Sequence, residues 1–341
     1  MMDRRSILGS MGGAMAALTF PQTAWPQTAA LPPRLKQGDT VGLIAPASSD
    51  DQPAHLEAAQ DTVRGMGLVP KVGRHASDIW GYFSGTDKDR ADDIHTMFAD
   101  DSVRAIFAIR GGWGSARLLP LLDWDLIRAH PKLLVGSSDV TALHLAIAAK
   151  TGFASIHGPN VSNRWEAISW NSLWQLAFTG ETPLLGAVSP EDSAQDRWRI
   201  TTIHPGKARG RLLGGNLSVL TSLVGTPWLP DFTGAILFIE DVGEAEYRID
   251  RMMSQLALSG LLGKLSGVIF GQCMRCSANV PNYAGFTVPD VLGQYLKPLG
   301  VPAFSGANIG HIANQLSLPV GAHVEMDADA GTISVLQRIV G

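Results

Sequence analysis

The chain has 341 residues, of which 45% are hydrophobic and 17% are charged, so it is long enough to bury the cores of two domains. Its formal net charge is −4 at pH 7 and its isoelectric point is about 6.1, which leaves no basic surplus for binding nucleic acid. The sequence has no fixed-period repeat and no heptad array, which excludes solenoids and coiled coils.

The first thirty residues differ in kind from the rest of the chain. Arg4 and Arg5 precede a short apolar stretch rich in glycine and alanine, residues 9–20, and small residues follow at Ala29-Ala30. This order predicts an export signal over residues 1–30, and the paired arginines resemble the twin-arginine type. The apolar stretch is shorter than the roughly 20 residues of a membrane span, so we expect no stable membrane anchor. We predict a periplasmic protein, or a cytoplasmic one if the segment is only a basic tail.

Short apolar runs alternate with amphipathic ones from residue 39 onward, a pattern typical of a parallel α/β sheet. The pattern predicts strands over residues 40–46, 103–109, 133–135 and 154–157, a helix over 55–67 and another that ends at 94–98. We therefore expect residues 31–160 to form a flavodoxin- or Rossmann-like α/β domain.

A glycine-rich loop, Arg110-Gly-Gly-Trp-Gly114, follows the strand predicted to end at residue 109. Adjacent glycines let a backbone N–H group approach a ligand without a side-chain clash. A dinucleotide-binding fingerprint does not fit, because its third glycine position, counted from Gly112, falls on Arg117. We predict an oxyanion or substrate loop, with a purely structural turn as the alternative.

A second loop of small residues, Gly136-Ser-Ser-Asp139, joins an apolar strand to a helical run over residues 140–149. A serine on such a turn is exposed, and the helix N-terminus offers unpaired N–H groups and a partial positive charge. Serine hydrolases need this arrangement, because the oxyanion formed in acyl transfer must meet donors already in place. We favour Ser138 over Ser137 as the nucleophile, because Gly136 and Ser137 complete the turn. A serine that only caps the helix is the alternative.

The pattern blurs over residues 161–205, which we predict to be a linker with one helix over 172–178. Alternation then resumes and predicts a β/α domain over residues 206–341. Its expected elements are strands over 235–239, 267–270 and 301–307, helices over 217–224, 247–258 and 288–299, and a hairpin of 323–326 with 332–335.

His311 is the histidine best placed to act as a base, because it directly follows the strand expected over 301–307. Ligand-facing residues of parallel sheets gather at the carboxyl ends of strands. His144 lies six residues beyond Ser138 on the same helix, about 9 Å along its axis, and is too far away. His157 ends a strand and could lie near the site or be buried and structural.

Glu240 follows the strand over 235–239, so an apolar strand delivers a carboxylate to its carboxyl end. That carboxylate would orient the imidazole and offset its positive charge during proton transfer. Asp241 and Glu244 remain alternatives for this role, and Glu240 or Asp241 could instead cap the following helix.

The two cysteines, Cys273 and Cys276, form a C-x-x-C pair. No second Cys/His pair stands at zinc-ligand spacing, and the pair opens onto a loop rather than a helix. We therefore expect neither a metal site nor a redox motif but two thiols without a role, which an exported protein could oxidise.

Together these motifs resemble the LD-carboxypeptidase family, the muramoyltetrapeptide carboxypeptidases, whose relatives include microcin self-immunity peptidases. The resemblance runs from about Gly38 to the C-terminus. It is carried by Val41-Gly-Leu-Ile-Ala-Pro46, Ile109-Arg-Gly-Gly-Trp-Gly114, Gly136-Ser-Ser-Asp139, His157-Gly-Pro159, Gly214-Gly-Asn-Leu217, Ile239-Glu-Asp241, Tyr247-Arg-Ile-Asp-Arg251 and Gly310-His311.

The resemblance implies an N-terminal α/β domain that carries the nucleophile and a C-terminal β/α domain that carries Glu and His, usually in a homodimer. It implies a triad of Ser138, Glu240 and His311, with an oxyanion hole made by the backbone N–H groups of Gly112 and Asp139. The implied activity is that of a serine carboxypeptidase that releases the terminal D-alanine of murein tetrapeptides through an acyl-enzyme. It needs no metal or cofactor.

Arg110 and Trp113 are candidate substrate-binding residues, and Arg110 could hold the terminal carboxylate, because arginine pairs carboxylates bidentately. Two rival functions stay open. One is a peptidase of the same family that acts on another amide, such as a peptidyl-nucleotide. The other is a non-catalytic periplasmic binding protein with two α/β lobes. Murein-recycling members of the family act in the cytoplasm, in contrast to the export signal predicted for this chain.

Overall fold

The computed structural model describes residues 30–186, 199–277 and 283–341. The export signal predicted over residues 1–30 lies outside these ranges apart from Ala30. Among the helices of the described residues, none is both long enough and apolar enough to cross a membrane.

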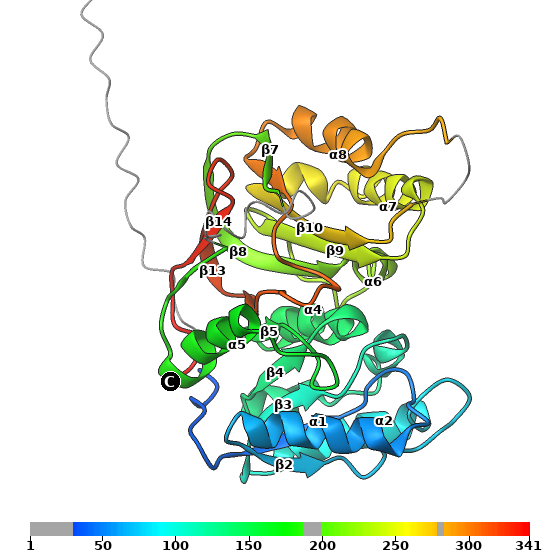
Figure 1. Cartoon of the computed structure of the whole chain (residues 1–341), viewed down its shortest axis with the longest axis vertical. Coiled ribbons are helices and arrows are strands. Elements are labelled where there is room, and N and C mark those ends of the chain that lie inside the picture. The colour runs from blue at the N-terminus through cyan, green and yellow to red at the C-terminus, as the bar shows by residue number, and fades with distance from the viewer. Residues whose placement is uncertain (1–29, 187–198, 278–282) are drawn as a thin grey trace, which may run out of the picture.

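The first half of the chain forms a sheet in the order β12-β5-β4-β3-β1-β2, in the lower part of Figure 1. Its strands are β1 (Thr40–Ile44), β2 (Val69–Val72), β3 (Val103–Ala108), β4 (Leu133–Gly136), β5 (Ser155–His157) and β12 (Leu318–Val320). The first five strands are parallel, and β12 pairs with β5 in the antiparallel sense. The helices of this half are α1 (Pro53–Gly65), α2 (Asp87–Ala99), α3 (Trp124–Ala129) and α4 (Thr141–Lys150), with short 3₁₀ turns η1 (Ser115–Leu118) and η2 (Ser138–Val140).

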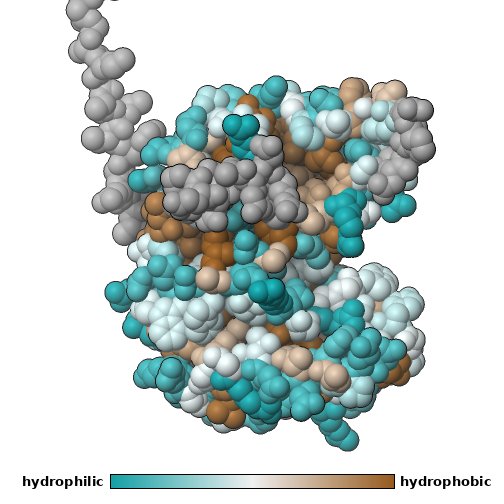
Figure 2. Space-filling view, in the orientation of Figure 1, coloured by the Kyte–Doolittle hydropathy of each residue, from teal (hydrophilic) through white to brown (hydrophobic). Residues whose placement is uncertain are grey.

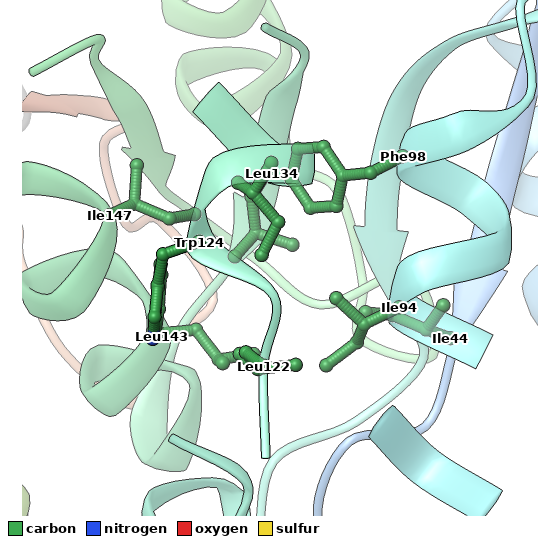
Figure 3. Close-up of a pocket in the computed structure, with 9 residues that line it drawn as sticks. Ile44, Ile94, Phe98, Leu122, Trp124, Leu134, Leu143 and Ile147 are labelled. Atoms are coloured by element: carbon green, nitrogen blue, oxygen red, sulfur yellow. The ribbon is translucent and has the colours of Figure 1, made fainter. Parts of the chain in front are cut away.

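The packing between this sheet and α2, α3 and α4 encloses a small cavity of about 10 Å³ (Figure 3). Its wall is apolar or aromatic throughout: Ile44, Ile94, Phe98, Leu122, Trp124, Ile127, Leu134, Leu143 and Ile147. This volume is at the lower limit for a single water molecule, and the wall offers a water no polar anchoring group. The cavity is therefore part of the hydrophobic core rather than a ligand site.

The second half forms a larger sheet in the order β6-β14-β13-β8-β9-β10-β11-β7, in the upper part of Figure 1. Its strands are β6 (Leu184–Leu185), β7 (Thr201–His204), β8 (Lys207–Asn216), β9 (Ile236–Val242), β10 (Gly267–Met274), β11 (Ala303–Ser305), β13 (His323–Asp327) and β14 (Thr332–Val335). Its helices are α6 (Leu217–Ser222), α7 (Glu246–Leu258) and α8 (Val288–Leu296), with η6 (Leu262–Lys264) and η7 (Lys297–Leu299). Strands β8 to β11 are parallel. Strands β13 and β7 pair with them in the antiparallel sense, and β14 and then β6 continue the sheet beyond β13 in the same sense.

Strand pairing crosses the predicted segment boundaries twice. Residues 161–205, predicted to be a linker with one helix, hold α5 (Ala167–Leu173) with the π-helical turn η3 (Trp174–Thr179) and supply both outer strands of the second sheet, β6 and β7. Conversely, β12 comes from the predicted second domain but extends the first sheet. These strands have two to four residues, too few to show a periodic pattern.

The two halves meet along α4, which lies between the sheets in Figure 1 and contacts β5 on one side and β8 and α6 on the other. The space-filling view shows the molecule indented between the halves on the right-hand side (Figure 2). The carboxyl ends of β4, β9 and β11 carry the candidate site residues, so their geometry decides whether these residues meet.

Candidate active site

The turn after β4 has the geometry of a nucleophile elbow. Strand β4 ends at Gly136, and the helical turn η2 begins two residues later at Ser138. Ser138 has a φ of +64°, in the left-handed region that a residue with a Cβ rarely adopts. The sharp turn from strand to helix exposes the hydroxyl to the space before the helix N-terminus. This is the strand, turn and helix that the sequence predicts here.

The structure brings Ser138, His311 and Glu240 together from three distant parts of the chain. The Nε2 atom of His311 lies 3.0 Å from Oγ of Ser138, placed to accept a hydrogen bond from the hydroxyl. On the other side of the ring, Nδ1 lies 2.7 Å from Oε2 of Glu240. A base in contact with a hydroxyl and oriented by a carboxylate is the arrangement that activates a serine.

Glu240 is completely buried near the carboxyl end of β9. Its Oε2 atom bonds His311, and its Oε1 atom has no hydrogen-bond partner among the described residues. Gly310 allows the segment that carries His311 to pack closely against β9 and β10. A Cβ at this position would lie 3.2 Å from Oε2 of Glu240 and 2.8 Å from the carbonyl oxygen of Gln272. The φ of +125° at Gly310 also excludes most other residues.

The largest influence on the pKa of the His311 imidazole is burial, which by itself would lower it. The hydrogen bond that His311 donates to Glu240 and the negative charges of Glu240 and Asp241 act in the opposite direction, and together they hold the pKa above its ordinary value of 6.5. The imidazole is thus a stronger base than a free histidine, and the neighbouring carboxylates stabilise its protonated form.

The other two acids that the sequence offers for this role bond elsewhere. The carboxylate of Asp241 accepts hydrogen bonds from the side chain of Asn216 and from the backbone and hydroxyl of Ser218, at 2.8–3.1 Å, and so fixes the start of α6. Glu244 pairs with Arg248 at 3.5 Å. Glu240 is therefore the one of the three acids that contacts the imidazole.

The glycine loop after β3 lies directly against the nucleophile turn. A Cβ at Gly111 would be 2.8 Å from Cβ of Ser138, and one at Gly112, where φ is +112°, would be 2.2 Å from Oγ of Ser48. In the loops and turns that the structure describes, neither the N–H of Gly112 nor that of Asp139 donates to a backbone carbonyl. The N–H groups of Gly112 and Asp139 therefore remain the candidate donors beside Ser138.

Ser48 supports this loop and was missed in the sequence analysis. Its hydroxyl accepts a hydrogen bond of 3.1 Å from the N–H of Trp113, and its own N–H contacts the carbonyl of Gly111 at 3.4 Å. Ser48 lies just beyond the carboxyl end of β1, the same edge of the sheet as the nucleophile. That position is a signal that could have identified it.

The two candidate substrate-binding residues of this loop, Arg110 and Trp113, lie in different surroundings. The guanidinium of Arg110 donates to the carbonyl of Ser49 at 2.9 Å and pairs with Asp50 at 3.2 Å. Trp113 is half exposed, at 50%, and its ring lies near those of Tyr82 and Phe83. Arg110 is therefore largely neutralised by its own neighbours, whereas Trp113 leaves an aromatic face open.

His144 and His157 are buried structural residues. His144 bonds the hydroxyl of Ser155 at 2.8 Å and the carbonyl of Gly136 at 2.9 Å, and burial lowers its pKa to about 4. His157 packs edge-on against Phe238, and burial lowers its pKa well below 6.5. Neither contacts Ser138 by a hydrogen bond in the described structure, which excludes His144 as a base and favours the structural alternative for His157.

His144 should make stability depend on pH between 6.5 and 4. The folded state keeps the imidazole neutral down to about pH 4, while the unfolded chain binds a proton near 6.5, so stability falls as the pH falls through this window. The loss should be about 3 kcal/mol. Urea unfolding of the wild type and of His144→Asn at pH 7, 5.5 and 4 measures it. Equal pH dependence of the two proteins would contradict the assignment.

Cys273 and Cys276 form a disulfide, the oxidised state that the sequence left open for an exported protein. Their Cα atoms lie 5.4 Å apart, within the range that a disulfide bridges. The short spacing is accommodated because Arg275, between them, takes a left-handed conformation with φ at +57°. Sequence spacing did not reveal this backbone conformation.

In the described residues, one group of three side chains has the spacing of metal ligands: His75, Asp78 and Asp89, whose ligand atoms lie within 4.8 Å of one another. His75 is already paired with Asp78 at 2.7 Å, and the hydrogen bond to Asp78 helps to raise its pKa against the effect of burial. The ion pair accounts for the grouping without a cation.

Comparison with known proteins gives consistent matches over both halves. Residues 41–158 match the family model of the LD-carboxypeptidase N-terminal domain, and residues 209–326 match that of the C-terminal domain. A probable murein peptide carboxypeptidase of Bacillus subtilis is 38% identical over 301 residues, which cover 87% of this chain and 91% of that protein.

Two solved structures are similar as well. The microcin C7 self-immunity protein MccF, known from Escherichia coli, superposes with a TM-score of 0.81 at 27% identity, over 91% of this chain and 99% of that one. A muramoyltetrapeptide carboxypeptidase from Oxalobacter formigenes gives a TM-score of 0.71 at 27% identity, over 86% and 97% of the two chains.

Matches of this extent define the class of protein: it is a carboxypeptidase, and therefore a hydrolase. The chain belongs to the LD-carboxypeptidase family. The α/β fold with two domains and the family resemblance predicted from the sequence are confirmed. A non-catalytic binding protein no longer competes with the enzyme.

Proposed function

We propose that this protein is a serine LD-carboxypeptidase that hydrolyses the L,D bond before the terminal D-alanine of murein tetrapeptides. The observation that carries the proposal is the hydrogen-bonded series of Ser138, His311 and Glu240, with contacts of 3.0 and 2.7 Å. The choice of substrate is supported by relatives named murein peptide carboxypeptidase and murein tetrapeptide carboxypeptidase.

In the proposed reaction, the hydroxyl of Ser138 attacks the carbonyl carbon of the L-centre while Nε2 of His311 takes its proton. The carbonyl oxygen becomes an oxyanion, which the N–H groups of Gly112 and Asp139 stabilise; one such donor contributes about 3 kcal/mol. The carboxylate of Glu240 holds Nδ1 of the imidazole and offsets the positive charge of the protonated ring.

The tetrahedral intermediate collapses when the C–N bond breaks, and His311 returns the proton to the amine of the departing D-alanine. A water molecule, deprotonated by the same imidazole, then attacks the acyl-enzyme and releases the shortened peptide from Ser138. The imidazole serves as base and acid in turn, which suits a ring whose pKa is raised above 6.5.

We also propose that residues 1–30 direct export, so that the enzyme meets peptides from wall turnover in the periplasm, and that it acts as a homodimer. Both statements remain predictions. The detection of protein that begins near Leu31 in a periplasmic fraction would support export, and only full-length protein in the cytosol would contradict it.

The substrate is tested by incubating the purified enzyme with murein tetrapeptide and measuring free alanine. We expect release of D-alanine, and none from a matched peptide that ends in L-alanine. A third arm uses an aminoacyl sulfamoyl nucleoside of the kind bound in a solved MccF complex. Faster cleavage of this compound than of the tetrapeptide would favour the second candidate, a peptidase for another amide, which the TM-score of 0.81 to MccF supports.

A further inference from the structure

The strand β10 ends in a turn that presents an arginine. Arg275 lies between Cys273 and Cys276, whose disulfide closes the turn around it, and has a φ of +57°. The N–H of Cys276 also donates to the carbonyl of Cys273 at 3.4 Å. The backbone of the turn is therefore constrained at both ends, while the side chain of Arg275 is exposed.

This turn is the direct neighbour of the segment that carries His311. The N–H of Gln272 donates to the carbonyl of Ile309 at 2.7 Å, and a Cβ at Gly310 would lie 2.8 Å from the carbonyl oxygen of Gln272. Arg275 is also among the charges that act on the imidazole of His311, where it works against the pKa-raising effect of Glu240. This charge effect is the smallest of those on the imidazole, so the proximity of the two residues follows from the backbone contacts between their segments.

Arg275 is a cation that the described residues leave uncompensated: no carboxylate among them forms an ion pair with it. By contrast, Arg110 pairs with Asp50, and Arg248 pairs with Glu244. An uncompensated positive charge beside an imidazole that must become protonated opposes catalysis, because like charges repel. The cost disappears if the substrate itself brings a negative charge to Arg275.

The substrate of a carboxypeptidase brings that charge on the residue that leaves. His311 gives its proton to the nitrogen of this residue, and its carboxylate carbon is bonded to the same Cα. Standard N–Cα and Cα–C bonds place the two atoms about 2.5 Å apart. A receptor for the terminal carboxylate must therefore lie on the His311 side of the site, where Arg275 is found.

We propose that Arg275 binds the terminal carboxylate of the substrate and that the disulfide-closed turn holds it beside His311 for this purpose. The inference rests on the proposed carboxypeptidase function and assigns to Arg275 the role that the sequence suggested for Arg110. It explains why a residue in a left-handed conformation carries a long cationic side chain at this point. Binding pairs the guanidinium with a carboxylate and removes its opposition to the protonated imidazole.

The test compares murein tetrapeptide with the same peptide amidated at its C-terminus. Hydrogen bonds to a charged group contribute about 1.5–3 kcal/mol, so the wild type should prefer the free carboxylate by about 10- to 100-fold in kcat/KM. In Arg275→Gln the preference should fall to a few-fold, mainly through a higher KM for the carboxylate peptide, while hydrolysis of the amide is retained. Arg275→Lys should restore part of the preference.

Two matched arginine variants complete the experiment. Arg128→Gln, on α3 and paired with Asp125, should keep the wild-type preference. Arg110→Gln tests the rival receptor, and loss of the preference there but not in Arg275→Gln would overturn the inference. Equal loss of both substrates in Arg275→Gln would overturn it too, because that is the sign of a structural role. If the wild type releases neither alanine from the free peptide nor alaninamide from the amidated one, the proposed function is overturned, and the inference with it.

Discussion

Replacing Ser138 with alanine should abolish release of D-alanine, with kcat lowered by at least about 10⁴-fold. The variant lacks the atom that forms the acyl-enzyme, so the neighbouring donors and the imidazole are left without a nucleophile. The fold should be unaffected, because alanine fits the same backbone and the lost hydroxyl bonds only the side chain of His311 in the described structure. The measurement is free D-alanine over time, beside a thermal unfolding curve.

Ser137→Ala is the matched control, because it removes a hydroxyl one residue away on the same turn. The hydroxyl of Ser137 is buried and lies 3.4 Å from the side-chain nitrogen of Asn160, a weak contact. We expect activity within about tenfold of wild type. The nucleophile assignment fails if Ser138→Ala keeps a tenth of the activity or if Ser137→Ala loses as much as Ser138→Ala.

The three residues of the candidate triad could be predicted because each comes at or after the end of an apolar run. Strands β4, β9 and β11 are short hydrophobic runs, and the polar residue at the end of each run marks the edge of the sheet. Spacing along the helix also sufficed to exclude His144. A choice among Glu240, Asp241 and Glu244 needed the structure, because all three lie within five residues and only three-dimensional contacts separate them.

The longest strand of the second sheet was not predicted, because its glycines hide the pattern. Strand β8 contains three glycines, and each is needed for close contact. A Cβ at Gly210 would lie 2.2 Å from the carbonyl oxygen of Gly234, and one at Gly214 would lie 1.7 Å from that of Phe238. Glycine normally weakens a strand, so the sequence pattern argues against a strand here, although these glycines are what let β8 approach β9.

The junction of the two halves explains why residues on different sheets can form one site. The N–H of Asn216, at the end of β8, donates to the hydroxyl of Thr141 at the start of α4, at 2.9 Å. A Cβ at Gly215 would lie 2.3 Å from the same hydroxyl, so the end of β8 is in direct contact with the start of α4. Thr141 is three residues from Ser138, and this contact fixes the helix that follows the nucleophile turn against the sheet that contains Glu240 and whose strand β11 leads to His311.

Replacing Glu240 with glutamine should lower kcat by about 10⁴-fold and change its pH dependence. The carboxylate accepts a hydrogen bond from the N–H at Nδ1, which keeps the proton of the neutral imidazole on that nitrogen. Nε2 is then free to take the proton of Ser138. The carboxamide can present its N–H₂ group to Nδ1 instead, which favours the tautomer that cannot act as a base. Removal of the buried negative charge also destabilises the protonated ring.

The direction of the pH change follows from the pKa of His311. The imidazole is a base only when neutral, so kcat/KM rises with pH through that pKa, which Glu240 helps to hold above 6.5 against burial. Without the carboxylate, burial and the charge of Arg275 should lower the pKa of His311. The acid limb of the profile of kcat/KM against pH should therefore move to lower pH, while the maximum value of kcat/KM falls.

Profiles of kcat/KM between pH 5 and 9 for the wild type, Glu240→Gln and Glu244→Gln measure both effects. Glu244→Gln removes a carboxylate four residues away that pairs with Arg248, so it should keep both the rate and the acid limb of the wild type. An acid limb that stays in place in Glu240→Gln, or moves to higher pH, would mean that this carboxylate does not control the imidazole. A shift in Glu244→Gln of the same size would point to the general charge of the region rather than to the contact of 2.7 Å between Glu240 and His311.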